Sequence, residues 1–148
     1  MRRESIMEAM RTLPLLTIVL AVGGAFGQQS TISVEEAKSL VRVVLRHEKL
    51  KLSSRYCELE QVRGDGRPFV PEYYSFSASC DYPNAKATSV LGLYVVSPRT
   101  GEVWEFNGCR RFRFSELTEI QRKIMRQTHA TEAVEANYRK NVGCAEAK

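Results

Sequence analysis

Cysteine offers the widest range of chemistry in this sequence, because thiols form disulfides, bind metals and act as nucleophiles. Successive cysteines are 23, 29 and 35 residues apart, so no C-x-x-C pair is present, and His47 and His129 do not stand at ligand spacing from any of them. An even number of cysteines in a small chain with an export signal, described below, favours two disulfides. The four are Cys57, Cys80, Cys109 and Cys144.

Two other arrangements could support catalysis. A cysteine–histidine pair would need a free thiol, and a cysteine held in a disulfide cannot attack a substrate. Glu58 and Glu60 flank Leu59 in the manner of the paired carboxylates of glycoside hydrolases. The alternating pattern around them explains both as outward-facing side chains of a strand. We therefore expect no catalytic residue, no bound metal and no cofactor.

Residues 104–114 (WEFNGCRRFRF) interleave arginine with aromatic side chains, which are the residue types that anchor protein interfaces. Two interpretations are open. The stretch could grip an acidic protein or a glycan, or Phe112 and Phe114 could fill the core while the arginines are solvated. The candidate binding residues under the first interpretation are Trp104, Arg110, Arg111 and Arg113.

The N-terminal segment has the three regions of a secretory signal peptide. Three arginines precede an apolar stretch at 13–22 (LPLLTIVLAV), and Ala25 and Gly27 place small residues at the −3 and −1 positions before Gln28. A membrane-spanning helix needs about 20 predominantly apolar residues, and this stretch is shorter. We expect residues 1–27 to be cleaved and the mature chain to be secreted or periplasmic, without stable membrane insertion. The candidate start codons are those of Met1, Met7 and Met10.

Residues 28–148 are expected to form a single domain, with a core at 33–128 and a C-terminal extension at 129–148. Because residues 1–27 hold three arginines and two glutamates, the mature 121 residues carry 19 basic and 15 acidic side chains. This mild excess permits an acidic partner without requiring one. The sequence shows no dense basic stripe and no recognisable nucleic-acid-binding module, so we expect no nucleic-acid partner.

Hydrophobic periodicity predicts helices at both ends of this domain and strands between them. Ser33 and Glu36 form a capping box, and helical spacing of apolar residues continues to Glu48. Ser115 is expected to cap a second helix, and a thin apolar line predicts a short third helix at 130–142. Alternating patterns predict four strands, separated by a loop at 63–71 and tight turns, at 55–62, 72–80, 89–96 and 101–107.

This order of elements predicts an α+β domain in which an N-terminal helix packs on a four-stranded antiparallel meander, followed by one or two C-terminal helices. From Ser33 to Phe106 the order, together with the hairpin sequence YVVSPRTGEV at 94–103, resembles small exported PepSY-like and cystatin-like domains. The resemblance implies a binding or inhibitory module rather than an enzyme. The four cysteines and the C-terminal extension depart from the PepSY pattern, so no functional residue is carried over.

The expected function is therefore that of an exported, non-enzymatic binding or inhibitory module. Two alternatives stay open. The first is a structural, envelope-associated protein that docks to a larger assembly, and the second is a small hydrolase.

The expected strand order also predicts the disulfide pairing. A hairpin across the loop at 63–71 brings Cys57 near Cys80. Cys80 and Cys109 would flank one central strand about 10 Å apart, whereas a disulfide needs Cα atoms within about 7 Å. Cys109 is then left for Cys144, and that bond would pin the C-terminal segment against the edge of the sheet.

Cleavage after Gly27 predicts that Gln28, free or cyclised, is the N-terminus of the exported protein. Intact-mass analysis or N-terminal sequencing of exported material measures this directly. Recovery of membrane-embedded protein that still carries residues 1–27 would contradict the assignment of a signal peptide.

Overall fold

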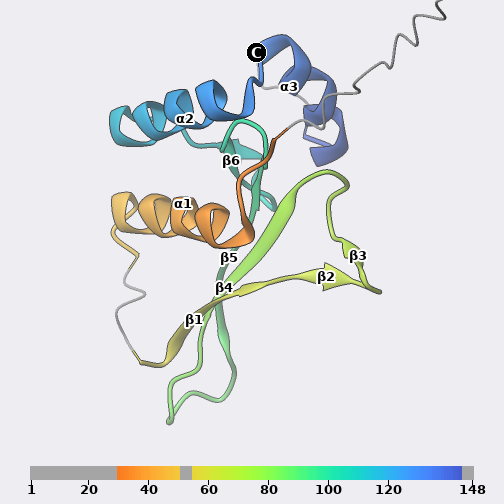
Figure 1. Ribbon diagram of the computed structural model, residues 1–148. Coiled ribbons are helices and arrows are strands. Elements are labelled where there is room, and N and C mark those ends of the chain that lie inside the picture. The colour runs from red at the N-terminus through yellow and green to blue at the C-terminus, as the bar shows by residue number, and fades with distance from the viewer. Residues whose placement is uncertain (1–29, 51–54, 145–148) are drawn as a thin grey trace, which may run out of the picture.

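The computed structural model describes residues 30–50 and 55–144, so the expected signal peptide at 1–27 lies outside the described residues. Within these described ranges the fold is α+β, with three α-helices and a five-stranded antiparallel sheet (Figure 1). Among the described residues no helix is long and apolar enough to cross a membrane. The helices and the final 3-10 turn are α1 (Val34–His47), α2 (Ser115–Thr128), α3 (Glu132–Arg139) and η1 (Lys140–Val142).

The main sheet has the strand order β1-β4-β5-β6-β7, and each neighbouring pair is antiparallel. Four strands were expected. The fifth, β7, comes from the stretch that follows the last expected strand, where Arg111 pairs with Trp104 of β6. The strands of this sheet are β1 (Cys57–Gln61), β4 (Tyr74–Cys80), β5 (Ser89–Val96), β6 (Val103–Glu105) and β7 (Arg110–Arg111).

The segment expected to be a plain loop, residues 63–71, contains a small hairpin of β2 (Arg63–Gly64) and β3 (Arg67–Pro68). Asp65 and Gly66 form its turn with φ angles of 42° and 78°. An Asp-Gly pair with positive φ at both positions matches the twist of two antiparallel strands. Asp-Gly turn chemistry thus outweighed the proline and glycine content on which the loop prediction was based.

Helix α1 begins as the sequence predicts. The Ser33 hydroxyl accepts a hydrogen bond from the Glu36 backbone N–H, and the Glu36 carboxylate accepts one from the Ser33 N–H. The second of these bonds lowers the pKa of Glu36, because it stabilises the ionised carboxylate. Helix α2 differs from expectation: Phe114 is its N-cap, without a side-chain bond, and Ser115 is the first helical residue.

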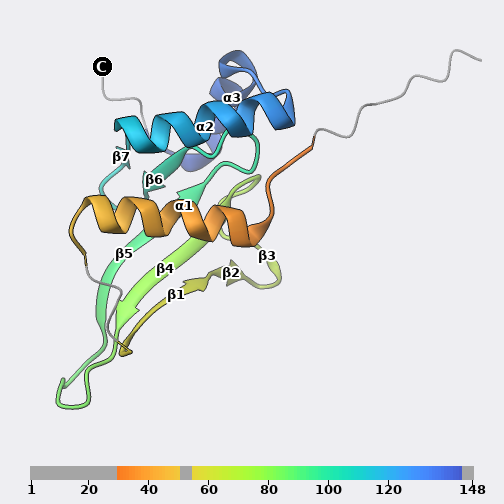
Figure 2. The same cartoon turned by 60° about the vertical axis from the view of Figure 1, so that its left-hand side comes forward.

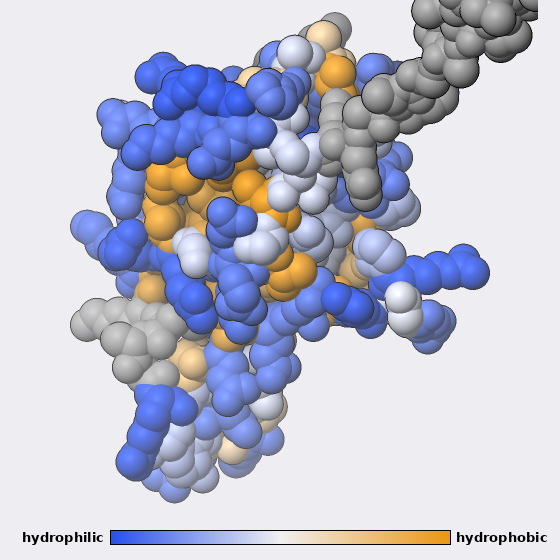
Figure 3. All heavy atoms as spheres, in the orientation of Figure 1, coloured by the Kyte–Doolittle hydropathy of each residue, from blue (hydrophilic) through white to orange (hydrophobic). Residues whose placement is uncertain are grey.

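Both faces of the sheet are covered, but unequally. Helices α1 and α2 pack on one face over a large core that includes Phe76, Tyr94 and Leu117. Helix α3 lies on the other side of the sheet, near β6 (Figures 1 and 2), where a smaller core gathers Val95, Trp104 and other residues. The lower ends of β1, β4 and β5 extend beyond the helices in both views. Apolar surface remains visible between α1 and α2 (Figure 3).

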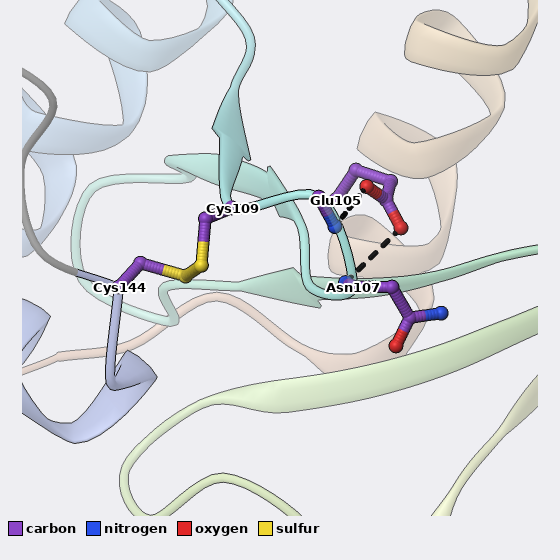
Figure 4. The surroundings of a disulfide bond; sticks show 5 residues. Glu105, Asn107, Cys109 and Cys144 are labelled. Carbon is purple, nitrogen blue, oxygen red and sulfur yellow. Dashed lines mark hydrogen bonds between the residues drawn. A yellow bond between two sulfur atoms is a disulfide. The ribbon is translucent and has the colours of Figure 1, made fainter.

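Two disulfides join the cysteine pairs expected from the sequence. Cys57 and Cys80 are direct partners in the β1–β4 ladder, with Cα atoms 3.9 Å apart, and Cys109 bonds Cys144 across 5.3 Å. The strand geometry used to place Cys109 was wrong, because Cys109 lies in the turn between β6 and β7 rather than opposite β5 (Figure 4). The Glu105 carboxylate holds that turn by accepting backbone hydrogen bonds, one of them from Asn107.

Gly101 is the point at which the two helices of the large core meet the β5–β6 turn. Its φ angle is +69°, and a Cβ atom there would lie 2.6 Å from Ile124 Cδ1 and 3.0 Å from Leu40 Cδ1. Glycine suits the backbone conformation, and any side chain here would force the ends of Ile124 and Leu40 to shift.

Substitution of Gly101→Ala should lower the free energy of unfolding by about 2–4 kcal/mol, because it adds overpacking of about 1–3 kcal/mol to a left-handed backbone cost of about 1 kcal/mol. Gly66→Ala is the matched control, because Gly66 also has positive φ but nothing lies within 4 Å of the position that a Cβ atom would take there. Urea denaturation measures both variants. Equal losses in the two would show that the close contacts at Gly101 do not matter.

Candidate functional site

The four candidate interface residues do not form one surface patch. Trp104 is 4% exposed and belongs to the smaller core, and Arg111 is largely buried. Arg110 is exposed, pairs with Glu48 at 2.7 Å and lies over the ring of Phe112. Arg113 is exposed. Only two of the four side chains are therefore available to a partner at the surface.

Trp104 and Arg111 lead instead into a buried charged network under α3. Its first centre is Glu102, which is 2% exposed. The indole N–H of Trp104 donates to Glu102 Oε1 at 2.5 Å, and Arg111 and Arg139 pair with Glu102 Oε2 at 2.5 and 2.7 Å. Arg139 also pairs with Glu132 of α3. This arginine therefore links α3 to Glu102 in the turn between β5 and β6.

The second centre is Glu135 of α3, which is completely buried. Its carboxylate accepts hydrogen bonds from the Tyr73 hydroxyl at 2.6 Å and the Ser97 hydroxyl at 2.8 Å. Arg99 pairs with it at 3.3 Å and lies 3.4 Å from the ring centroid of Tyr138. Helix α3 thus buries a charged stripe, where the sequence predicted an apolar one.

The turn between β5 and β6 supplies Ser97, Arg99 and Glu102 to this network. The backbone N–H groups of Arg99 and Thr100 donate to the Ser97 hydroxyl, and Gly101 N–H donates to Ser97 C=O. Thr128 of α2 donates its hydroxyl to the Arg99 carbonyl at 2.6 Å. A buried turn must satisfy most of its polar groups internally, and these bonds do so for the backbone groups that they join. Nη2 of Arg99 is the exception, because it is buried without a hydrogen-bond partner.

Burial and the contacts of the network shift the pKa values of three of its members, Arg139, Arg111 and Tyr73. Hydrogen bonds to Glu102 raise the pKa of Arg139 above its usual range. Burial lowers the pKa of Arg111, although the nearby Glu102 opposes that shift. Burial, followed by the hydrogen bond to Glu135, raises the pKa of Tyr73, so its hydroxyl remains a donor.

These contacts account for how α3 is placed rather than for catalysis. Buried ion pairs contribute little net stability compared with apolar packing, but loss of one partner leaves an uncompensated charge. The network therefore favours a single docked position of α3. In any other position its charged side chains would be exposed to solvent or would lose their partners. A signal for it existed in the sequence: Glu132, Glu135 and Arg139 share one helical face at spacings of three and four.

The residues considered for catalysis lie outside this buried network. Glu58 and Glu60 are exposed on the edge strand β1, and the cysteines of both disulfides have no free thiol. Among residues 30–50 and 55–144 no group of three or more His, Cys, Asp or Glu side chains is arranged to hold a metal ion. Disulfides of this kind persist in oxidising compartments.

Comparison with known proteins gives two matches. Residues 31–135 match the family described as the type VI secretion system (T6SS) immunity protein Tgi2PP. The fold matches a chain in the structure of a type VI secretion system effector-immunity complex from Pseudomonas protegens, with a TM-score of 0.75 and 34% sequence identity. That match covers 80% of this chain and 94% of the other. The chain matches none of the curated proteins.

These matches correct several expectations from the sequence. The PepSY-like and cystatin-like assignment is wrong, because the hairpin 94–103 that suggested it is turn chemistry common to many folds. The general binding module, the envelope structural protein and the hydrolase are likewise replaced, and a glycan or a generic acidic protein is not the indicated partner. The family match spans most of the chain and agrees with the structural match in fold and context. The chain belongs to the family of type VI secretion system immunity proteins described as Tgi2PP.

Proposed function

We propose that this chain is an immunity protein that binds a cognate T6SS effector and neutralises it. The observation that carries the proposal is the family match over residues 31–135. The likeness to a chain of an effector-immunity complex, which extends over 94% of that chain, supports it independently of the family match. A protein with such a role needs a rigid surface complementary to one partner.

We propose that neutralisation occurs by binding and not by catalysis. The strongest cluster of titratable side chains in the described residues, around Glu102 and Glu135, is enclosed and engaged in holding α3. Its carboxylates already have close cationic or hydroxyl partners, so they are not poised to transfer a proton to a substrate.

We further propose that the protein acts in the periplasm. Two disulfides support an oxidising compartment, and the expected signal peptide at 1–27 supplies the route of export. The arginine surface expected from the sequence remains a prediction for its two exposed members, Arg110 and Arg113.

Deletion of the gene for this chain should make cells sensitive to a sibling strain with an active T6SS. Survival in a mixed culture is expected to fall at least about tenfold, because a bound effector is inactive and a free one is not. A complementing copy of the full chain should restore survival, and a copy without residues 1–27 should not.

The control for this competition is a sibling strain whose T6SS has been inactivated, against which the deletion strain should survive normally. Equal survival of the deletion strain against active and inactive siblings would contradict the immunity function. Full rescue by the copy without residues 1–27 would contradict the periplasmic site of action alone.

A further inference from the structure

One part of the sheet is left uncovered by all three helices. The register of β1, β4 and β5 forms two rows across this part of the sheet. One row holds Glu58, Ser79 and Val90. The next holds Glu60, Ser77 and Leu93. The residues between these rows, Leu59 and Ala78, belong to the large core. Because side chains alternate along a strand, the two rows lie on the face away from α1 and α2. We call this surface the open sheet face, and its members are Glu58, Glu60, Ser77, Ser79, Val90 and Leu93.

Helix α3 covers only the other end of this face. The smaller core ends at Val95 and Trp104. These two residues form the next row on this face after that of Glu60, Ser77 and Leu93. Val90 is 67% exposed, the highest value among the exposed large apolar side chains in the described residues. Val90 and Leu93 are the apolar members of a surface that is otherwise charged and polar.

The charges of the open sheet face indicate the chemistry of that partner. The chain carries a net charge of +5, and six of the twelve glutamates among the described residues are engaged in ion pairs, such as Glu48 with Arg110. Among residues 30–50 and 55–144, neither Glu58 nor Glu60 has an ion-pair partner. Two unpaired carboxylates on one edge strand attract a cationic surface.

A pocket at the end of this face provides a second, independent observation. Val62 donates its N–H to the Ser75 carbonyl at 2.8 Å, and the chain then leaves the sheet for the β2–β3 hairpin. Between that hairpin and β4 lies a pocket of about 350 Å³, lined by residues that include Val62, Arg63, Tyr73 and Ser75. Ser75 is 2% exposed, and its hydroxyl has no hydrogen-bond partner.

A buried hydroxyl without a partner is unfavourable by about 1–3 kcal/mol. Ser75 precedes Ser77 and Ser79 on the same face of β4, but it pairs with Val95 in the row that the smaller core covers. Its hydroxyl is therefore buried at the margin of the open sheet face and is not one of its exposed members. Ser75 lines the pocket, so a hydrogen-bonding side chain of a partner that entered the pocket would be the group to satisfy this hydroxyl.

We propose that the open sheet face and this pocket dock a cationic segment of the effector. Lys or Arg side chains of that segment pair with Glu58 and Glu60, apolar groups cover Val90 and Leu93, and one polar side chain bonds Ser75. This inference rests on the proposed immunity function, and it names the surface and partner chemistry through which that function operates.

The double substitution Glu58→Lys and Glu60→Lys tests the charge complementarity. In the deletion strain, this variant should restore survival against the active sibling at least about tenfold less well than the wild type. The matched control is Glu35→Lys with Glu119→Lys, which makes the same change in charge at two exposed helical positions. Thermal denaturation should be alike for both variants, because exposed side chains away from buried contacts change stability little.

A second comparison uses Arg110→Glu with Arg113→Glu, the exposed remainder of the arginine surface. If this variant loses protection while the Glu58/Glu60 variant protects fully, the open sheet face is not the docking surface. If the wild-type chain itself fails to protect, the immunity function has failed, and that outcome is distinct from a failure of the surface.

Ser75→Ala separates a binding role of the hydroxyl from a structural one. Removing an unsatisfied buried hydroxyl should leave thermal stability unchanged or higher, while protection should decrease. Lower stability with normal protection would overturn the role of the pocket.

A photo-crosslinking residue identifies the occupant directly. Placed at Ser79, it should yield a covalent adduct with an effector peptide only when the sibling strain has an active T6SS, and placed at Ser39 of α1 it should yield none. Adducts with a second copy of this chain, or adducts at Ser39 alone, would overturn the proposal.

Discussion

The buried carboxylates of Glu102 and Glu135 are the constraint on which the rest of the structure depends. Each is almost or entirely inaccessible to water, so each must find its partners within the fold. The hairpin turn supplies Arg99 and Ser97, β7 supplies Arg111, and α3 supplies Arg139. These residues come from segments distant in the sequence, and the network is complete only when the turn, β7 and α3 are all in place.

This constraint also determines which part of the sheet the described helices leave uncovered. Helix α3 is held over the end where β5, β6 and β7 pair, and the bond between Cys109 and Cys144 fastens the chain that follows it. The opposite end, where Glu58 and Val90 lie, receives no helix, and the Cys57–Cys80 disulfide joins its strands. A rigid, uncovered end of a sheet suits an immunity protein, because a preorganised surface loses little entropy on binding.

Periodic patterns in the sequence predicted the elements that pack by apolar contact. The capping box of α1, the bounds of β5 and the α+β class followed from local rules. The β2–β3 hairpin, β7 and the buried face of α3 did not, because a two-residue strand has no measurable period and a helix that buries charges inverts the usual pattern. Trp104 was a surface residue only under the interface interpretation, whereas both interpretations placed Arg111 outside the core. Only the register shows that Glu102 lies within reach of them.

The most direct test of this account is amide hydrogen exchange in the variant Glu102→Gln. The substitution keeps the shape of the side chain but leaves two buried arginines without their shared charge, a loss of about 3–5 kcal/mol for such pairs. The account predicts that amides of α3 (Glu132–Arg139) exchange at least about tenfold faster than in the wild type, while those of α1 change less. Unchanged exchange throughout α3 would show that the network does not hold this helix in place.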